Sequence, residues 1–282
     1  MKNILIFGLL ILLLISCNNT KLTPNEKKDN LKSNKSTIVK LPHALDEISG
    51  LSTTSDGRLF CHDDERGIIY HIDSETGKII KRFQVGKIGL DLDFEGMAIA
   101  GEKFFLISSN GRLYEFEEGK DLEKVTFKEY NLGFSMNFEF EGLCYNSQTN
   151  SLLMASKKHP GKIHKGNRAI YSFSLENHKL NNSPLFLIPL KELSKKFDIK
   201  DFYPSGIIIH PSSGDYYIIS SKGRPSLVRI SKSGELLNAY KLDKKTFAQP
   251  EGIVFLSNST LLISNEAKAK RATLVKLNLS EL

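Results

Sequence analysis

A short motif that returns five times constrains the fold of this chain more than any other feature. A carboxylate and a glycine come just before an apolar stretch in DEISGLS, DFEGMAI, EFEGLCY and QPEGIVF, and YPSGIII repeats the pattern without the acid. The copies are marked by Glu47 (before Ile48-Ser49-Gly50), Glu95, Glu141, Ser205 and Glu251, at intervals of 48, 46, 64 and 46 residues. Self-similarity at such a period indicates a repeat architecture.

Each copy opens a unit of short apolar strands that are separated by Gly, Asn, Asp and Ser. In the second unit the strands read GMAIA, KFFLIS, RLYEFE and VTFKEYNL. Strands rich in Ile, Leu, Val, Tyr and Phe between such turns predict an all-β fold. The fifth unit ends after three strands, and STIVKLP (36–42) has no partner of its own. Because an N-terminal strand added to the last sheet would close a ring without an open edge, we predict a five-bladed β-propeller.

The third interval leaves a six-bladed propeller as the alternative, because it is longer than its neighbours by 18 residues. The surplus lies in KKHPGKIHKGNR (157–168) and KELSKKFDIKDFYP (191–204), and it is too short for four more strands. Leu193 and Phe197 stand at helical spacing in the second segment. We therefore predict a short helix or an ordered loop there.

The N-terminus has the features of a targeting segment. Lys2 is followed by an apolar run, Ile4 to Ile15, that is too short to span a bilayer. Leu14-Ile15-Ser16-Cys17 resembles the lipobox of bacterial lipoproteins, which implies cleavage before Cys17, acylation of its thiol and attachment to a membrane of the cell envelope, the outer membrane being our expectation. An ordinary signal peptide or an anchor helix is the alternative.

These features divide the chain into three parts. We expect a signal peptide over residues 1–16, the acylated cysteine with a flexible tether over residues 17–36, and the propeller over residues 37–282. The tether contains almost no apolar side chains, so it cannot bury enough surface to offset the entropy of ordering.

Charge and cysteine content exclude several classes of function. The formal net charge of +7 is too mild to argue for nucleic acid, and no aromatic-and-basic RNA-binding pattern is present. We expect no nucleic-acid partner. Cys61 and Cys144 lie inside apolar strands, and no CxxC or Cys/His metal spacing is present. Both are expected to be buried small hydrophobes rather than a disulfide or catalytic thiols.

Four segments carry a resemblance to a known family. DEISGLS, LFCHDDERGIIYHID, DLDFEGMAI and QPEGIVF are similar to the SdiA-regulated (YjiK-like) bacterial propellers, over roughly residues 38–282. The resemblance implies a β-propeller grouped with calcium-linked, phytase-like propellers, and it implies little about activity. One departure is that Pro204-Ser205 replaces the opening carboxylate in the fourth unit, so a complete acidic ring is not available.

Strand direction in a propeller places the repeated motif on one face. The innermost strand of each blade begins there, and the second strand returns to it, so the loop after the second strand lies on the same face. Four carboxylates are therefore expected to converge near the axis: Glu47, Glu95, Glu141 and Glu251. The ligand-binding residues predicted beside them are Asp63, Asp64, Arg66, Lys157, Ser205, Lys222 and Arg224.

Converging carboxylates are costly unless a cation, protonation or hydrogen bonds relieve them. Oxygen ligands without cysteine or a histidine pair suit Ca²⁺ better than zinc, so the four glutamates are predicted calcium ligands. Alternatively, the glutamates could accept N–H groups from the adjacent blade while the glycines permit close approach of the strands. His62 is expected to be a strand histidine with satisfied hydrogen bonds rather than a catalytic base.

Three functions follow from these predictions. The first is a lipid-anchored propeller that binds a ligand, such as an anionic small molecule, with Ca²⁺ on this face. The alternative is a calcium-dependent, phytase-like phosphomonoesterase or esterase, in which carboxylate-held metal polarises the phosphate. The third is a platform for a protein partner, because propeller faces often bind proteins.

Overall fold

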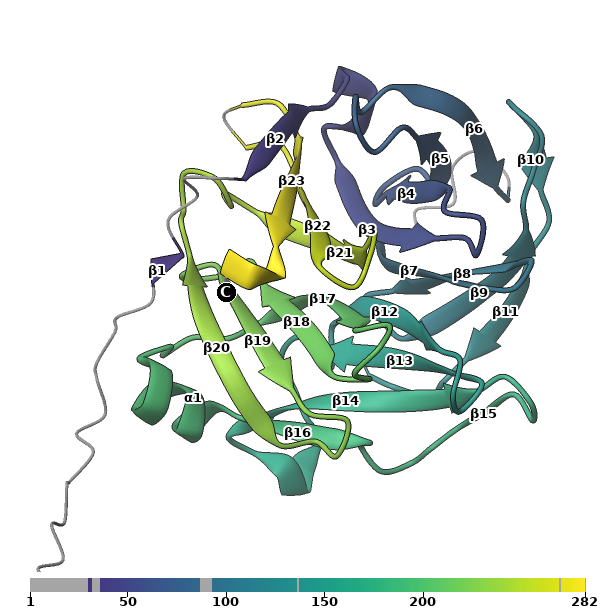
Figure 1. The fold of residues 1–282 in the computed structure, drawn as a ribbon. Coiled ribbons are helices and arrows are strands. Elements are labelled where there is room, and N and C mark those ends of the chain that lie inside the picture. The colour runs from purple at the N-terminus through teal and green to yellow at the C-terminus, as the bar shows by residue number, and fades with distance from the viewer. Residues whose placement is uncertain (1–29, 32–35, 87–92, 136, 269, 282) are drawn as a thin grey trace, which may run out of the picture.

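The computed structural model describes residues 30–31, 36–86, 93–135, 137–268 and 270–281. Five sheets surround a common axis, which confirms the predicted five-bladed β-propeller (Figure 1). The described residues contain no sixth blade. They also contain no helix long and apolar enough to cross a membrane. Cys17, the signal peptide and most of the tether lie outside the described residues, so the predicted acylation stays a prediction.

Each blade contains four main strands, numbered from the axis outward. In the first blade they are β3 (Ile48–Thr53), β4 (Leu59–Asp63), β5 (Ile68–Ile72) and β6 (Ile79–Val85). In the second they are β7 (Phe94–Ala100), β8 (Lys103–Ser108), β9 (Arg112–Glu117) and β11 (Lys128–Asn131). In the third they are β12 (Phe140–Asn146), β13 (Ser151–Ser156), β14 (Asn167–Ser174) and β16 (Phe186–Pro189), with the short β15 (Lys179–Leu180) also paired to β14.

The last two blades follow the same order. In the fourth blade the strands are β17 (Pro204–Ile209), β18 (Tyr216–Ser220), β19 (Ser226–Ile230) and β20 (Leu236–Leu242). In the fifth they are β21 (Pro250–Phe255), β22 (Thr260–Asn265), β23 (Thr273–Asn278) and β2 (Thr37–Lys40).

An N-terminal strand closes the ring, as predicted. β2 pairs antiparallel with β23, with Ile38 opposite Val275, so the first and last segments of the fold share a sheet (Figure 1). The connection continues beyond β2, where the N–H of Leu41 donates to the carbonyl of Ala272 at 2.9 Å. Closure leaves the fifth blade with a complete outer strand and removes an open edge.

Besides β15 in the third blade, two further blades carry a fifth strand that the sequence did not predict. β10 (Lys124–Val125) pairs in parallel with β6 of the first blade, and β1 (Asn30–Leu31) pairs in parallel with β20 of the fourth. VTFKEYNL was predicted as one outer strand of the second blade. The structure divides this segment between two sheets. Its first part belongs to β10, which pairs with the first blade, and its second part forms β11, the outer strand of the second blade.

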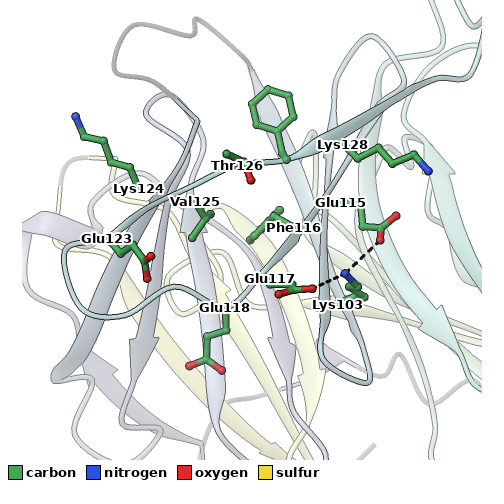
Figure 2. A pocket seen from close by; sticks show the side chains of 11 residues that line it. Lys103, Glu115, Phe116, Glu117, Glu118, Glu123, Lys124, Val125, Thr126 and Lys128 are labelled. Atoms are coloured by element: carbon green, nitrogen blue, oxygen red, sulfur yellow. Dashed lines mark hydrogen bonds and ion pairs between the residues drawn. The ribbon is translucent and has the colours of Figure 1, made fainter.

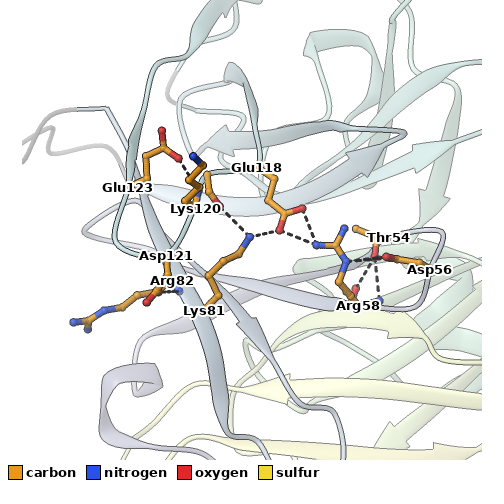
Figure 3. A network of polar contacts seen from close by, with 10 residues as sticks. Thr54, Asp56, Arg58, Lys81, Arg82, Glu118, Lys120, Asp121 and Glu123 are labelled. Atoms are coloured by element: carbon orange, nitrogen blue, oxygen red, sulfur yellow. Dashed lines mark hydrogen bonds and ion pairs between the residues drawn. The ribbon is translucent and has the colours of Figure 1, made fainter.

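Ion pairs fix this crossing segment to the first blade. Both carboxylate oxygens of Glu118 accept hydrogen bonds from Arg58, at 2.7 and 2.8 Å, and Lys81 donates to the Gly119 carbonyl at 2.9 Å (Figure 3). The backbone N–H of Arg82 donates to Asp121 at 3.0 Å. The first and second blades are therefore joined at their outer edges as well as near the axis.

The surplus of the third interval forms ordered connections, as expected. α1 (Leu190–Phe197) is the predicted short helix, and Leu193 is its buried residue. The other segment contains the single-turn 3₁₀ helix η2 (Lys162–His164).

The two strand cysteines are buried free thiols, as the sequence predicted. Cys61 packs between the first and fifth blades, and Cys144 packs between the third and fourth. Burial raises the pKa of both thiols, so neither has the character of a nucleophile.

The five innermost strands pack directly against one another around the axis. A Cβ atom on Gly96 would lie 2.8 Å from the Leu143 nitrogen, and one on Gly206 would lie 2.7 Å from the Glu251 carbonyl oxygen. The backbone φ angle is not positive at these glycines. The repeated glycine is therefore required for close approach of neighbouring strands rather than for an unusual φ.

We expect Gly96→Ala to lower the free energy of unfolding by about 3 kcal/mol, since the new methyl group must displace neighbouring backbone. Gly101→Ala is the control, because that turn glycine has a φ of +63° and open space around it. The strain of its left-handed φ alone should cost about 1 kcal/mol. Urea unfolding of both variants measures the difference, and an equal loss of stability would contradict the close-approach interpretation.

Candidate functional site

A β-bulge occupies the start of every innermost strand. The pairs Ile48–Asp63, Phe94–Ser108, Phe140–Ser156, Pro204–Ser220 and Pro250–Asn265 align the five blades, and the register shifts just after each of them. The residue that follows the first member of each pair forms what we call the inner ring: Ser49, Glu95, Glu141, Ser205 and Glu251.

The alignment moves one predicted residue away from the axis. Ser49, rather than Glu47, occupies the inner-ring position of the first blade. Glu47 lies two residues earlier in the chain. An outer ring is formed by the residues at that equivalent position: Glu47, Asp93, Glu139, Tyr203 and Gln249. In four blades the carbonyl of this residue accepts a backbone N–H from the residue after the second strand.

The two inner-ring serines fasten neighbouring blades. Ser49 Oγ donates to the Glu95 carbonyl at 3.0 Å, and Ser205 Oγ donates to the Pro250 carbonyl at 2.6 Å. Within the described ranges, no backbone N–H donates to the carboxylates of Glu95, Glu141 or Glu251. The alternative prediction was that glutamates join adjacent blades by accepting N–H groups. In the structure the two serines join adjacent blades instead, by donating to carbonyl groups.

A lysine lies among the three inner-ring glutamates. Lys157 follows β13 and forms an ion pair with Glu141, whose side chain is only 4% exposed. Its Nζ atom is also 3.6 Å from a carboxylate oxygen of Glu139, and Glu139 pairs in addition with Lys158. Burial alone would lower the pKa of Lys157, but the adjacent Glu141 carboxylate, helped by Glu251 and Glu95, raises it overall. Lys157 therefore stays charged and partly neutralises the carboxylates.

Protonation reduces the remaining negative charge of these glutamates. Burial, and then the charge of Glu141, raises the pKa of Glu95 to about 10. Burial and Glu141 likewise raise the pKa of Glu251 well above its ordinary value, although Lys157 opposes the shift. Burial raises the pKa of Glu141 to about 7 against the opposing effect of Lys157. Near neutral pH, Glu95 is thus a carboxylic acid that can donate a hydrogen bond.

A second acidic group lies where the fifth blade meets the first. Burial and the charges of Asp63 and Glu47 raise the pKa of Asp64 to about 7, and Asp64 Oδ1 is buried without a partner among the described residues. Burial and a hydrogen bond with Glu47 raise the pKa of Glu266 to about 7. Asp64 and Glu266 are therefore partly protonated near neutral pH.

Two polar residues singled out in the sequence, Asp63 and His62, form hydrogen bonds that stabilise the fold. Asp63 is 1% exposed and accepts hydrogen bonds from Arg66 through its backbone N–H at 2.8 Å and its Nε at 3.1 Å. His62 accepts the Gly50 N–H at Nε2, at 3.0 Å, and burial lowers its pKa to about 4. His62 is therefore the satisfied strand histidine that the sequence predicted, and Asp63 and Arg66 stabilise their own turn.

Basic side chains surround the centre of this face. Lys222 and Arg168 lie on the ring of Tyr203, at 5.1 and 4.6 Å from its centroid. Lys222 and Arg224 are both exposed in the loop after β18, as predicted. We call the following exposed lysines the basic rim: Lys158, Lys162, Lys165, Lys222, Lys268 and Lys270.

The described carboxylates do not fit the predicted calcium site. Among the residues that the structure describes, no group of three or more His, Cys, Asp or Glu side chains could hold a metal ion. Lys157 supplies the positive charge instead, since it pairs with Glu141. Calcium binding stays a prediction.

The sequence-based reasoning missed the outer ring and the role of Ser49. Asp93 and Glu139 both precede an inner-ring glutamate by two residues, in DFEG and EFEG. That shared spacing was a signal that could have identified them. Nothing comparable in the sequence indicated Tyr203, which belongs to the outer ring only because the blades align by their bulges.

A family model supports the assignment that the motifs suggested. A family described as SdiA-regulated matches residues 27–224 of the chain. QPEGIVF, residues 249–255, lies beyond the matched part. No curated protein sequence matches the chain.

Solved structures of low sequence identity share the fold. The glutaminyl cyclase of Myxococcus xanthus is 13% identical, with a TM-score of 0.56 over 86% of this chain and 95% of that one. The PQQ-bound aldose sugar dehydrogenase of Streptomyces coelicolor is 11% identical, with a TM-score of 0.55 over 86% and 98%. A streptogramin B lyase is 13% identical, with a TM-score of 0.51 over 86% and 98%. At these identities the likeness shows the propeller fold alone.

The raised pKa of Glu95 predicts how stability depends on pH. The unfolded pKa is near 4.5 and the folded value is about 10, so the native state binds more protons between these values. This contribution to stability is complete below pH 4.5 and is lost as the pH rises toward 10, by at most about 1.4 kcal/mol per pH unit. Glu95→Gln removes it, so the variant should gain stability relative to the unmodified protein as the pH rises.

Chemical unfolding at several pH values between 5 and 10 measures this difference. Glu117→Gln is the control, because Glu117 is exposed and its ion pair with Lys103 lowers its pKa. Its stability difference from the unmodified protein should stay constant above pH 5. A Glu95→Gln curve parallel to that of the unmodified protein would show that Glu95 is ionised in the fold.

Proposed function

The chain belongs to the SdiA-regulated family, and we propose that it is a binding protein that takes an anionic ligand on the face bearing the inner ring. The observation that carries this proposal is the group of Glu95, Glu141 and Glu251 around Lys157. Carboxylates with raised pKa values are found preferentially at functional sites. Holding such carboxylates together costs stability, so the fold alone gives no reason for them.

The fold itself does not require these glutamates. Ser49 and Ser205 occupy the same bulge position in two blades, where they form blade-to-blade hydrogen bonds. Blade packing can therefore be achieved with a small hydroxyl side chain. Three acids at equivalent positions add desolvation and like-charge repulsion without a compensating structural contact from the backbone. A binding role gives a physical reason for retaining them.

The charge distribution favours an anion. At the centre, Lys157 and a protonated Glu95 offer hydrogen-bond donors rather than a dense negative charge. Around the centre, the basic rim adds exposed ammonium groups from the third, fourth and fifth blades. A carboxylate or phosphate group could accept hydrogen bonds at the centre while the rim attracts it from solution.

A metal-dependent esterase receives less support. That activity would need a carboxylate-held cation to polarise a phosphate, whereas the described side chains offer no set of three metal ligands. Lys157, which could neutralise the charge of a phosphate in such a mechanism, is paired with Glu141. Binding without catalysis is therefore the function we propose.

We expect inorganic phosphate or glycerol 3-phosphate, at ten times its Kd, to raise the thermal midpoint by about 4 °C at low ionic strength. Lys222→Gln combined with Lys268→Gln should weaken the effect several-fold, since both side chains belong to the basic rim. Lys124→Gln is the control, because it removes an exposed lysine outside the rim. An equal rise in all variants, or no rise in any, would contradict anion binding at this face.

The calcium prediction is tested in the same assay after chelation. A rise in midpoint with calcium that Glu95→Gln abolishes would restore the metal site and make phosphomonoester hydrolysis the next assay. An unchanged midpoint would contradict calcium binding. It would not bear on anion binding, which the phosphate experiment tests separately.

We also propose that Cys17 anchors the protein to a membrane of the bacterial envelope, since Leu14-Ile15-Ser16-Cys17 resembles a lipobox. In cells labelled with a palmitate analogue, the unmodified protein should carry the label and sediment with membranes. Cys17→Ser should lose both properties, because the acyl chains supply the binding energy through buried methylenes. Cys61→Ser is the matched control and should retain the label. Persistent labelling of Cys17→Ser would contradict the assignment.

A further inference from the structure

A groove on the opposite face of the propeller is independent of the inner ring. It lies between the third and fourth blades, where the turns after β12 and β17 approach those after β14 and β19. The cavity has a volume of about 360 Å³, within the range of small-molecule sites. Because the innermost strands end on this face, the groove is separated from Lys157 by the thickness of the disc.

The floor of the groove is polar and buried. Asn146, Ser151 and Ser172 line it, with exposed fractions of 8%, 5% and 4%. The side-chain oxygen Oδ1 of Asn146 accepts the backbone N–H of Gln148 at 3.0 Å. Within the described residues, the side-chain nitrogen Nδ2 of Asn146 donates to no other group. Burying polar side chains against a cavity is costly unless water or a ligand completes their hydrogen bonds.

The walls supply further neutral donors and acceptors. Asn181 donates from Nδ2 to Ser172 Oγ at 2.6 Å, and its side-chain oxygen Oδ1 accepts no hydrogen bond among the described residues. The Gln148 side chain is exposed and has no hydrogen bond among the described residues. Among the described residues that line the groove, none is a carboxylate and Lys232 is the one charged side chain. The half-exposed Leu185 adds an apolar surface, and the buried Tyr216 lies beneath the lining.

This composition differs from that of the wide groove at the edge of the second blade. That groove has a volume of about 670 Å³ and is lined largely by lysines and glutamates, among which Lys103 pairs with two glutamates (Figure 2). Lys103 lies 2.7 Å from Glu117 and 3.8 Å from Glu115 there. Lys103, Glu115 and Glu117 thus already have partners, whereas the side-chain amides of Asn146, Gln148 and Asn181 in the opposite-face groove retain unused hydrogen-bonding capacity.

We propose that the opposite-face groove binds a small neutral saccharide. A sugar hydroxyl both donates and accepts, so it complements amide side chains, which carry one donor and one acceptor group. The apolar face of a pyranose ring can pack on the half-exposed Leu185. The absence of carboxylates from the described lining disfavours a cation, and the single lysine gives only one contact for an anion.

Isothermal titration of the full chain with glucose, galactose and N-acetylglucosamine tests this proposal. We expect saturable binding of at least one sugar with a Kd on the order of 1 mM. Gln148→Ala and Asn181→Ala should each weaken it about threefold to tenfold, the loss of one hydrogen bond. Both residues are exposed, so the variants should fold.

Asn258→Ala is the matched control, because Asn258 is an exposed amide on a turn of the same face outside the groove. It should bind the sugar as the unmodified protein does. Absence of saturable binding for all three sugars would overturn the proposal, and so would an equal loss in all three variants or no loss in any. Binding of a neutral sugar does not depend on the basic rim. The result of this titration is therefore independent of the result of the anion-binding experiment.

Discussion

The close approach of five strands around one axis is the constraint on which the rest of this structure depends. Neighbouring innermost strands come so near that a single methyl group on Gly96 or Gly206 would meet backbone atoms of the next blade. The glycine also follows directly after a β-bulge, which re-aims the side chain before it. Packing near the axis thus dictates both where glycine must stand and which residue faces the centre of the disc.

That geometry gives the inner ring its unusual chemistry. Three glutamates on separate blades are brought together by the closure of the ring, where Glu141 is buried and Glu95 and Glu251 are partly buried. Their charges cannot all persist, so Lys157 pairs with Glu141 while burial raises the pKa of Glu95. Ser49 and Ser205 at the same position show that the acids are additions to a working scaffold. The serines hold blades together, and the glutamates create a polar centre.

Much of the fold was predictable because its signals are local and repeated. Alternating apolar strands and turn residues indicated five blades, and the missing strand of the last unit identified β2 as its completion. The excursion of β10 to the first blade was not predictable, since VTFKEYNL has strand character throughout and only the contacts of Glu118 show which sheet holds the first part. At the site, Glu95, Glu141 and Glu251 were found by spacing, but Glu47 was assigned to a position that belongs to Ser49.

The sequence by itself determined the repeat, the strand order, the glycines and the face on which polar residues gather, because each of these is written in residue type and spacing. Only the tertiary structure decided which side chains meet. Register and bulges set the alignment of blades, and these depend on packing between strands distant in the chain. For the same reason the protonation of Glu95, the pairing of Lys157 and the neutral groove between the third and fourth blades could not be read from spacing. Each depends on burial, which exists only once the ring has closed.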